Sequence, residues 1–321
     1  MTDFCFQVIR DLERHSSRLN KEAIILAQAE AGNTEFFDGC KLALDSMITF
    51  GLKQIPEKKD ETGDGLSWAG FNSVVERLRN RELTGNVARS AVDAMMNTAT
   101  KAEWNGWYRR ILIKDLRCGT SEKTINKVVE KKWPQYAVPV FSCQLAHDSA
   151  NHGAKVTGKK LIEVKLDGVR VITIVRADGR VDMFSRNGKE LVNFPHIAEQ
   201  ISAVIKKHGT TTNKDFVLDG EVMSSSFQDL MKQLHRKDDV QAQDARLMLF
   251  DILPLGEFKK GKSIMGQKRR TNLLKTLKPI FDKCGHIDVI NQIEVDLDTY
   301  VGELQFKQFN KDAIEGGYEG I

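Results

Sequence analysis

The spacing of apolar residues changes once along this 321-residue chain, near residue 136. Before that point, apolar residues recur every three or four positions, as at residues 23–27, which is typical of helices that bury one face. From residue 160 onward, apolar and polar residues alternate with a period of two, as at residues 170–175, which indicates strands. Because the two patterns suit different elements, the chain is predicted to hold two kinds of domain in succession.

We predict a multidomain protein, with an all-α domain at residues 1–135 and an α+β, mainly antiparallel domain at residues 154–321. Residues 136–153 are predicted to be the linker, because Pro134 and Pro139 interrupt a stretch of little periodicity. The sequence shows no internal repeat.

Composition excludes several classes of protein. No apolar run approaches the ~18 residues of a membrane span, and the first residues lack the basic flank and apolar stretch of a secretory signal. The net charge of +4, from 48 basic and 44 acidic residues, includes no long block of like charge. The five cysteines are odd in number and never spaced C-x-x-C, which argues against a disulfide framework or a structural zinc site. We therefore expect a cytoplasmic protein with no membrane partner.

Turn signals separate the predicted strands. Two β-prone runs at residues 170–175 and 181–184 flank Asp178-Gly179, which predicts a hairpin. A second turn is expected at Asn187-Gly188, and further strands at residues 216–222 and 247–253. A helix is predicted between those two strands from the spacing of Phe227, Leu230, Met231 and Leu234, with the serines at 224–226 as its N-cap.

Lys165 stands at the end of a strand that we predict to be buried, beside the turn Asp167-Gly168. Burying an ammonium without a partner is costly, so structure alone gives little reason for a lysine here. A nucleophilic amine, by contrast, needs a lowered pKa, which desolvation and nearby cations provide. Arg170 lies across the turn and suits a phosphate held beside the lysine. A hairpin with an exposed lysine and arginine is the alternative interpretation.

Residues 163–170, Glu-Val-Lys-Leu-Asp-Gly-Val-Arg, resemble the nucleotidyl-transfer lysine motif of the ATP-dependent DNA ligases. RNA ligases and mRNA capping enzymes share this superfamily. Segments that resemble the family's later motifs follow in the family's order, which is stronger evidence than one match. These segments are residues 184–188, 218–221, 249–253 and 319–321.

The resemblance implies an adenylation (nucleotidyltransferase) domain at residues 154–321, with ATP as adenylyl donor and Mg²⁺ as metal. Lys165 would be the catalytic nucleophile that forms a lysine–AMP intermediate. The residues implied to bind the nucleotide are Glu163, Arg170, Arg186, Glu221 and Phe250. Glu163 would accept from the adenine amine and Phe250 would stack on the ring. Glu221 and Glu319 would help to hold Mg²⁺ or the ribose. Asp219 would be either a metal-site residue or the turn residue before Gly220, and we favour the turn.

Residues 101–132 carry nine basic residues against four acids. They are predicted to form a helix, a turn at Gly119 and a second helix capped by Thr120 or Ser121, whose N-terminus suits a backbone phosphate. A solvated amphipathic face is the alternative. The stretch also resembles the helical DNA-binding domain of DNA ligases, above all those of T4-like bacteriophages. The DNA-binding residues implied in this way are Arg110, Lys114, Arg117, Lys123 and Lys127.

The sequence ends at Ile321, inside a motif that continues in the family, and the family's C-terminal OB-fold domain is absent. We therefore expect a fragment of a DNA ligase, monomeric, that acts on nicked double-stranded DNA and seals it poorly alone. An RNA ligase, a capping enzyme that uses GTP and a non-catalytic nick-binding module are the alternatives.

Overall fold

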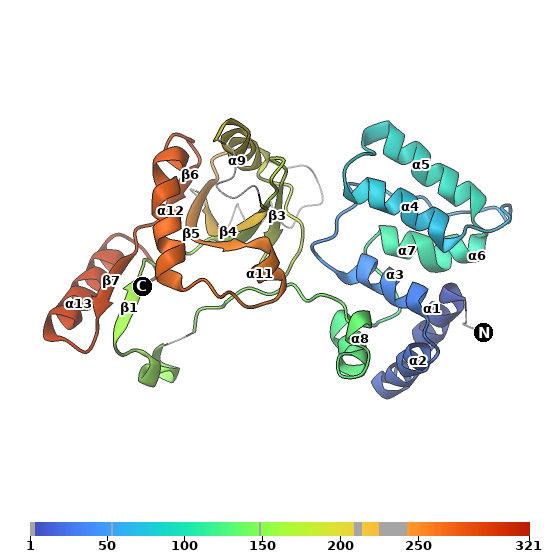
Figure 1. Cartoon of the computed structure of the whole chain (residues 1–321), viewed down its shortest axis with the longest axis horizontal. Coiled ribbons are helices and arrows are strands. Elements are labelled where there is room, and N and C mark those ends of the chain that lie inside the picture. The colour runs from blue at the N-terminus through green and yellow to red at the C-terminus, as the bar shows by residue number, and fades with distance from the viewer. Residues whose placement is uncertain (1–3, 53, 148, 209–213, 225–242) are drawn as a thin grey trace. The chain divides into compact units, whose positions relative to one another are not determined.

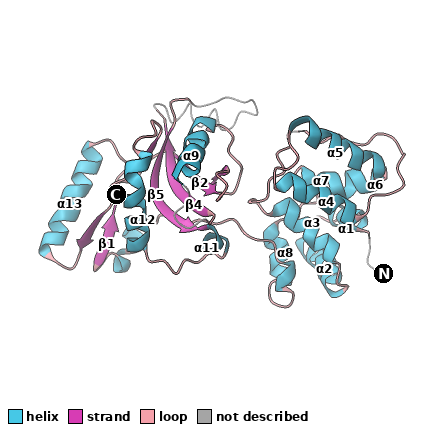
Figure 2. Ribbon diagram, turned by 45° about the horizontal axis from the view of Figure 1, so that its top comes forward, coloured by secondary structure: helices cyan, strands magenta, loops and turns pink. Residues whose placement is uncertain are grey.

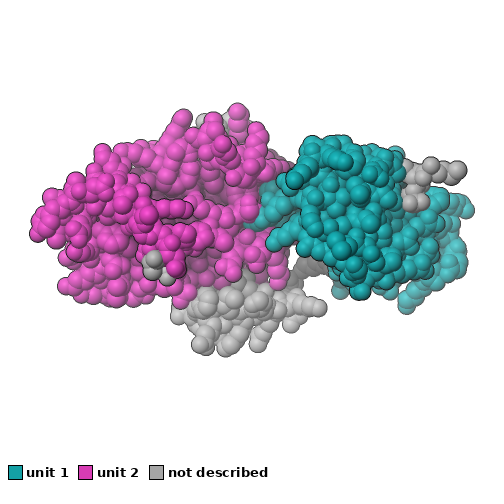
Figure 3. Space-filling model, turned by 90° about the horizontal axis from the view of Figure 1, so that it is seen from below, with its two compact units in different colours: residues 1–141 teal, residues 142–321 magenta. Residues whose placement is uncertain are grey.

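The computed structural model describes the chain except for residues 1–3, 53, 148, 209–213 and 225–242. It contains two compact units, residues 1–141 and residues 142–321 (Figure 3). The boundary between them falls inside the range 136–153 predicted as a linker. The helix predicted around Phe227–Leu234 lies outside the described residues. Within the described part of the chain, no helix is both long and apolar enough to cross a membrane.

In the first unit, every regular element among the described residues is helical (Figure 2). These elements are α1 (Cys5–Arg14), α2 (Arg18–Glu30), α3 (Thr34–Leu44), α4 (Trp68–Arg79), α5 (Gly85–Thr98), α6 (Lys101–Glu103), the π-helical turn η1 (Trp104–Tyr108), α7 (Arg109–Leu112), α8 (Glu122–Val129) and the 3-10 turn η2 (Pro134–Tyr136). Side-chain caps begin several of the helices. The side chain of Ser17 accepts from the backbone of α2, Asn33 does so for α3, and Ser67 for α4.

The core of this unit is built around tryptophan. Trp104 and Trp107 are buried, and the ring of Trp107 stacks on Phe36 with 6.0 Å between centroids. Helix α3 comes close to this ring because it carries Gly39. A Cβ added at Gly39 would lie 2.1 Å from Cζ2 of Trp107. The glycine therefore serves close packing, at the expense of local helix propensity.

Gly39→Ala should lower the free energy of unfolding of the first unit by ~1–3 kcal/mol, because the indole ring is buried and cannot yield. Alanine is the better helix former by about 1 kcal/mol, so a net loss has to come from packing, and the measured value understates the packing cost. Urea unfolding followed by tryptophan fluorescence reports on this unit, since all four tryptophans lie in it. Gly70→Ala in α4 is the control, because its Cβ would meet first the flexible Ser67 side chain, at 3.2 Å. Equal stability of the two variants would contradict the prediction.

The helix predicted before Gly119 ends earlier than the sequence suggested. It stops at Leu112, and Lys114 and Arg117 adopt positive φ angles of 60° and 52°, which breaks the helical path. Ser121 precedes α8 as predicted, but its side chain makes no capping hydrogen bond. The helix–turn–helix order is thus confirmed with a longer turn.

The second unit holds a five-stranded sheet with the order β3-β2-β4-β5-β6 (Figure 1). Its strands are β2 (Val169–Val175), β3 (Val181–Ser185), β4 (Phe216–Met223), β5 (Arg246–Pro254) and β6 (Ile287–Val289). The first three pairings are antiparallel and β5 pairs with β6 in parallel. The mainly antiparallel sheet and the Asp178-Gly179 hairpin are confirmed, and Gly179 supplies the positive φ of 87° that the turn requires.

A separate two-stranded sheet pairs β1 (Lys159–Ile162) with β7 (Ile293–Asp296) and carries α13 (Tyr300–Glu315). The other helices among the described residues of this unit are α9 (Pro195–His208), α11 (Leu255–Lys259) and α12 (Gln267–Phe281), and 3-10 turns lie at Ser149–Asn151 and Gly153–Lys155. Helices α9 and α12 cover one face of the large sheet (Figure 2). Their Ile197, Ile201 and Leu274 pack with Leu218 and Leu249 of the strands. The charged strand residues Arg170, Asp219 and Glu221 therefore face the opposite side.

Candidate active site

A cavity of about 1250 Å³ opens on the sheet face that carries the charged strand residues, and Gln267 and Arg270 at the start of α12 also line it. It is lined from β2, β4 and β5, from the segment after β1, and from the start of the unit at residues 142–146. The six residues that the sequence analysis assigned to catalysis or nucleotide binding all line it: Glu163, Lys165, Arg170, Arg186, Glu221 and Phe250. The structure thus brings these six residues together from positions up to 87 residues apart in the chain.

Lys165 lies three residues beyond β1, and its backbone bridges to the segment at residues 319–321. Its N–H donates to the Gly320 carbonyl at 2.8 Å, and the Glu319 N–H donates to the Lys165 carbonyl at 3.3 Å. The Nζ contacts the Glu319 carboxylate. The predicted buried strand is wrong: most of β1 is not buried, and the Lys165 side chain is 44% exposed. The ammonium is placed against a carboxylate at the mouth of the cavity, instead of being buried among cations.

Arg170 is held by Asp219. The guanidinium donates to both carboxylate oxygens at 2.9 and 2.6 Å and also to the carbonyl of Gln144. Asp219 is buried in the middle of β4, so its interpretation as a turn residue is wrong. Burial raises the pKa of this carboxyl, and the bonds from Arg170 oppose that rise. The pair fixes Arg170 with its guanidinium carbon 5.3 Å from the centroid of the Phe250 ring.

Phe250 reaches the cavity because of a β-bulge. Asp219 pairs with Asp251, but the next residue, Gly220, pairs with Leu249, so Phe250 is the extra residue of β5. Leu249 and Ile252 then both belong to the core beneath α9 and α12. Phe250 and Asp251, between them, both line the cavity. A regular strand would have sent one of the two into the core.

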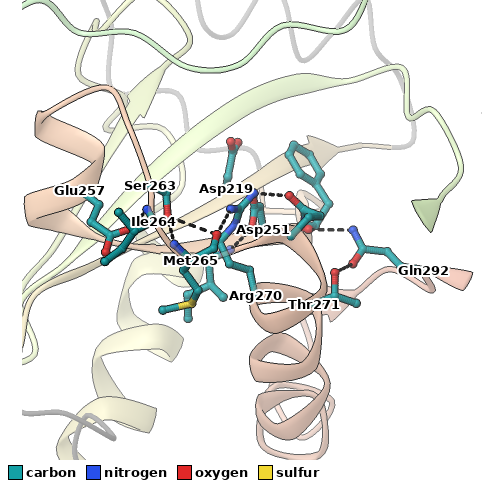
Figure 4. Close-up of polar contacts among 12 residues, drawn as sticks. Asp219, Asp251, Glu257, Ser263, Ile264, Met265, Arg270, Thr271 and Gln292 are labelled. Atoms are coloured by element: carbon teal, nitrogen blue, oxygen red, sulfur yellow. Dashed lines mark hydrogen bonds and ion pairs between the residues drawn. The ribbon is translucent and has the colours of Figure 1, made fainter. Parts of the chain in front are cut away.

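The buried Arg270 binds the carboxylate of Asp251, which lies opposite Asp219 across the sheet (Figure 4). Arg270, near the start of α12, donates to the two oxygens of Asp251 at 2.8 and 3.0 Å. Like charges directly opposite in a sheet are destabilising. Here Asp219 and Asp251 lie opposite each other, and each is neutralised by its own arginine, Arg170 or Arg270. Two charge-paired carboxylates therefore form the floor of the cavity.

Burial in the cavity also alters the ionisation of Glu163 and Glu221. Glu163 accepts a hydrogen bond from Gln292, and burial raises the pKa of its carboxyl. Glu221 accepts from the Gly168 N–H at 3.2 Å, and burial raises its pKa to about 7. The charge of Lys165 opposes the rise at Glu221, which places Glu221 in the electrostatic reach of the lysine.

Glu221 and Glu319 suit Mg²⁺ as a donor set. Both carboxylates interact with Lys165: Glu319 contacts its Nζ directly, and Glu221 is close enough for the charge of Lys165 to lower the pKa of its carboxyl. Among the described residues no cluster of three or more His, Cys, Asp or Glu side chains is arranged for a metal. Mg²⁺ typically uses one or two carboxylates and completes its shell with water and substrate phosphates. The residues present therefore fit Mg²⁺ bound together with a phosphate ligand.

Glu221→Gln should change how stability depends on pH. The carboxyl has a pKa of 4.5 in an unfolded chain and about 7 in the folded one. Below the lower value it is protonated in both states. Between the two values only the unfolded state releases the proton, so folding becomes less favourable as pH rises, and the loss is complete above the higher value. The glutamine variant lacks this loss.

We therefore expect Glu221→Gln to gain stability relative to the unmodified protein between about pH 5 and about pH 8. Denaturant unfolding followed by circular dichroism measures the difference, and Glu199→Gln, at an exposed position of α9, is the control. Excess Mg²⁺ together with inorganic pyrophosphate should shrink the difference at the higher pH, because a bound cation favours the ionised carboxyl. A difference that is constant with pH would contradict the prediction.

The predicted DNA-binding residues fall into two groups. Arg110 donates to the carbonyls of Asn105 and Leu116 and pairs with Glu13. Lys114 donates to the carbonyls of Leu42 and Asp45, at the end of α3. These two side chains are therefore engaged inside their own unit.

Arg117, Lys123 and Lys127 are exposed. Lys127 pairs with Glu22 of α2 at 2.8 Å, and Arg117 lies 3.9 Å from Asp115. These three side chains are the members of the predicted DNA-binding set that are accessible from solvent.

Sequence reasoning did not assign Asp219, Asp251, Arg270 or Gln292 to catalysis or to nucleotide binding. One signal was present, because Asp219 and Asp251 interrupt apolar strand patterns, and a carboxylate inside a strand needs a partner. Arg270 ends the basic run Lys268-Arg269-Arg270, and Gln292 lies in a short loop between β6 and β7. Neither residue has neighbours in the sequence that would indicate a place in the site.

Comparison with known proteins identifies the family. A family model described as "ATP dependent DNA ligase domain" matches residues 142–321, which is more than half of the chain. The chain therefore belongs to the ATP-dependent DNA ligase family. A solved structure named "Pmar-Lig_Pre." is 52% identical, with a TM-score of 0.61, and the match covers 99% of this chain and 73% of that one.

Two curated relatives are DNA ligases. That of Enterobacteria phage T4 is 27% identical over 150 residues, or 46% of this chain and 30% of its own length. That of the archaeon Haloferax volcanii is 31% identical over 182 residues, or 51% of this chain and 27% of its own length. The chain thus spans about a third or less of these relatives. Because a phage and an archaeal ligase match comparably, the T4-like type stays a prediction.

Proposed function

We propose that this chain is the nucleotidyl-transfer part of an ATP-dependent DNA ligase, which seals nicks in duplex DNA through a lysine–AMP intermediate. The observation that carries the proposal is the cavity at the sheet of the second unit. There Lys165 lies at the mouth, Arg170 is fixed over Phe250, and Glu163 and Glu221 line the walls. An amine nucleophile, an aromatic face, a guanidinium and carboxylates are the groups that adenylyl transfer from ATP requires.

In the proposed first step, Nζ of Lys165 attacks the α-phosphorus of ATP. A phosphorus–nitrogen bond forms, the bond from the α-phosphorus to the bridging oxygen breaks, pyrophosphate leaves, and the attacking nitrogen gives up its proton to water. The contact between Nζ and Glu319 has to open so that the amine lone pair can reach phosphorus. Arg170 and Arg186 would neutralise phosphate charge as it develops. Mg²⁺, when bound by Glu221 and Glu319, would supply further charge neutralisation at the phosphates.

In the following steps the AMP group passes from Lys165 to a 5′-phosphate at the nick. The 3′-hydroxyl then attacks that phosphate, and AMP leaves as the strand is joined. Each step exchanges one bond to phosphorus for another, so positioning and charge neutralisation are the contributions that the protein has to make.

For the DNA we propose the helical unit as a binding partner of the nick, as a monomer, with Arg117, Lys123 and Lys127 on phosphates. Their exposure supports this assignment. Arg110 and Lys114, also predicted to bind DNA, would act there by shaping the turn between α7 and α8. A ligase of this kind would act in the cytoplasm, within a bacterial host if it is of the phage type.

The test is incubation of the protein with radiolabelled ATP, then with nicked DNA. We expect a labelled protein that loses its label to the nick. Labelling by GTP instead would indicate a capping enzyme, and faster release to RNA nicks an RNA ligase. Nick binding without any labelled protein would indicate a non-catalytic module and would overturn the proposal.

A further inference from the structure

Gln292 links two walls of the nucleotide cavity. It lies in the turn between β6 and β7 and is only 5% exposed. Its Nε2 donates to the Glu163 carboxylate and, at 2.9 Å, to the backbone carbonyl of Phe250. Its Oε1 accepts from the Thr271 hydroxyl at 2.7 Å (Figure 4). Both amide hydrogens and the amide oxygen are therefore engaged.

The orientation of this amide is determined by its partners. The Phe250 carbonyl can only accept hydrogen bonds, and an ionised Glu163 can only accept as well. The NH₂ group must therefore face Glu163 and Phe250, and the oxygen must face Thr271, whose hydroxyl donates. Thr271 is itself buried in the first turns of α12, so the amide is anchored to a rigid element.

Glu163 needs such a partner because its surroundings disfavour its charge. Burial raises the pKa of the carboxyl, and the nearby Asp251 and Asp219 add to the rise. The hydrogen bond from Gln292 and the charge of Arg170 oppose it. Removal of the Gln292 donor leaves a more readily protonated carboxyl, and a protonated carboxyl carries an O–H that donates.

We propose that Gln292 is a positioning residue that determines base specificity: it holds Glu163 as a hydrogen-bond acceptor, so that the cavity takes a 6-aminopurine and rejects a 6-oxopurine. The inference rests on the proposed function, in which Glu163 meets the edge of the base and Phe250 its face. Adenine presents an amino donor at position 6, which an acceptor carboxylate satisfies. Guanine presents an oxygen there, and two desolvated acceptors facing each other are left unpaired.

The experiment compares labelling of Lys165 by radiolabelled ATP and GTP in the full chain. In Gln292→Met, which keeps the length of the side chain and removes its donor, we expect the preference for ATP over GTP to fall ~10- to 100-fold. Thr271→Val removes only the hydroxyl that orients the amide, so its preference should fall less. Gln308→Met, on the exposed face of α13, makes the same chemical change away from the cavity and should keep the preference.

The outcomes separate this inference from the proposed function. If the unmodified protein is not labelled by ATP, the proposed function fails, whatever Gln292 does. If it is labelled and Gln292→Met loses rate equally with both nucleotides, Gln292 is merely structural and the inference is overturned. Should Gln292→Met fail to fold, as judged by circular dichroism, Thr271→Val carries the test, and an unchanged preference in that variant overturns the inference.

Discussion

Lys165→Arg should abolish covalent labelling of the protein by ATP, with a loss of at least ~10³-fold in rate, because the Lys165 amine is the proposed nucleophile of the phosphoramidate bond. Arginine keeps a positive charge against Glu319, so the contact at the mouth of the cavity is preserved. Its guanidinium is protonated at all accessible pH values and has no lone pair for attack on phosphorus. The expected loss is therefore chemical and not structural.

Radiolabelled ATP and separation of the denatured protein measure the effect directly. Lys159→Arg, on the exposed side of β1 six residues earlier, is the matched control and should be labelled normally. Binding of nicked DNA should survive in Lys165→Arg, since the proposed phosphate contacts lie in the other unit. Labelling of Lys165→Arg at the normal rate would show that another residue is the nucleophile.

The strands of the large sheet could be predicted because each is a short, mostly apolar run bounded by turn signals. Their burial does not alternate cleanly, since the last five residues of β2 are all buried. The hairpin at Gly179 was visible for a local reason, since its positive φ favours glycine. The apolar pattern of a strand and the residue types of a turn depend only on a few neighbouring residues. Both features can therefore be predicted from one sequence.

Asp219 shows where local reasoning fails. An Asp-Gly pair favours a turn in most contexts, but here the aspartate bonds to Arg170, 49 residues earlier, and Gly220 fits against the Met248 carbonyl of the next strand. The bulge at Phe250 follows from that same strand pairing. Partners so distant in the chain produce no periodic pattern in the residues around Asp219. The motif therefore placed residues 218–221 in the site, but the favoured interpretation of Asp219 as a turn residue was wrong.

Lys165 fails in a comparable way. The residues before it alternate like a strand, but β1 pairs only with β7, over 130 residues later, and that small sheet leaves much of β1 exposed. Its contact with Glu319 depends on the same distant folding. The motif thus predicted Lys165 as the nucleophile from the sequence alone, whereas the surroundings of Lys165 could be described only from the tertiary structure.

Arg270→Met should be the most destabilising of the single changes considered, lowering the free energy of unfolding of the second unit by ~3–5 kcal/mol. Arg270 and Asp251 have side chains only 11% and 15% exposed. Loss of the guanidinium leaves Asp251 uncompensated, directly opposite Asp219 in the sheet. Arg180→Met is the matched control, because the pair of Arg180 with Asp178 is 41% and 56% exposed. An exposed pair of that kind contributes ~1 kcal/mol or less.

The second unit contains no tryptophan, so its unfolding is best followed by far-ultraviolet circular dichroism and by amide hydrogen exchange in β5. The double change Arg270→Met with Asp251→Leu should recover most of the lost stability, because replacing both members of a buried pair removes the unpaired charge. Recovery in the double variant would identify that charge, and not lost packing of the arginine stem, as the source of the effect. If the double variant is as unstable as Arg270→Met, packing is the cause and the charge-paired floor of the cavity is not what stabilises this sheet.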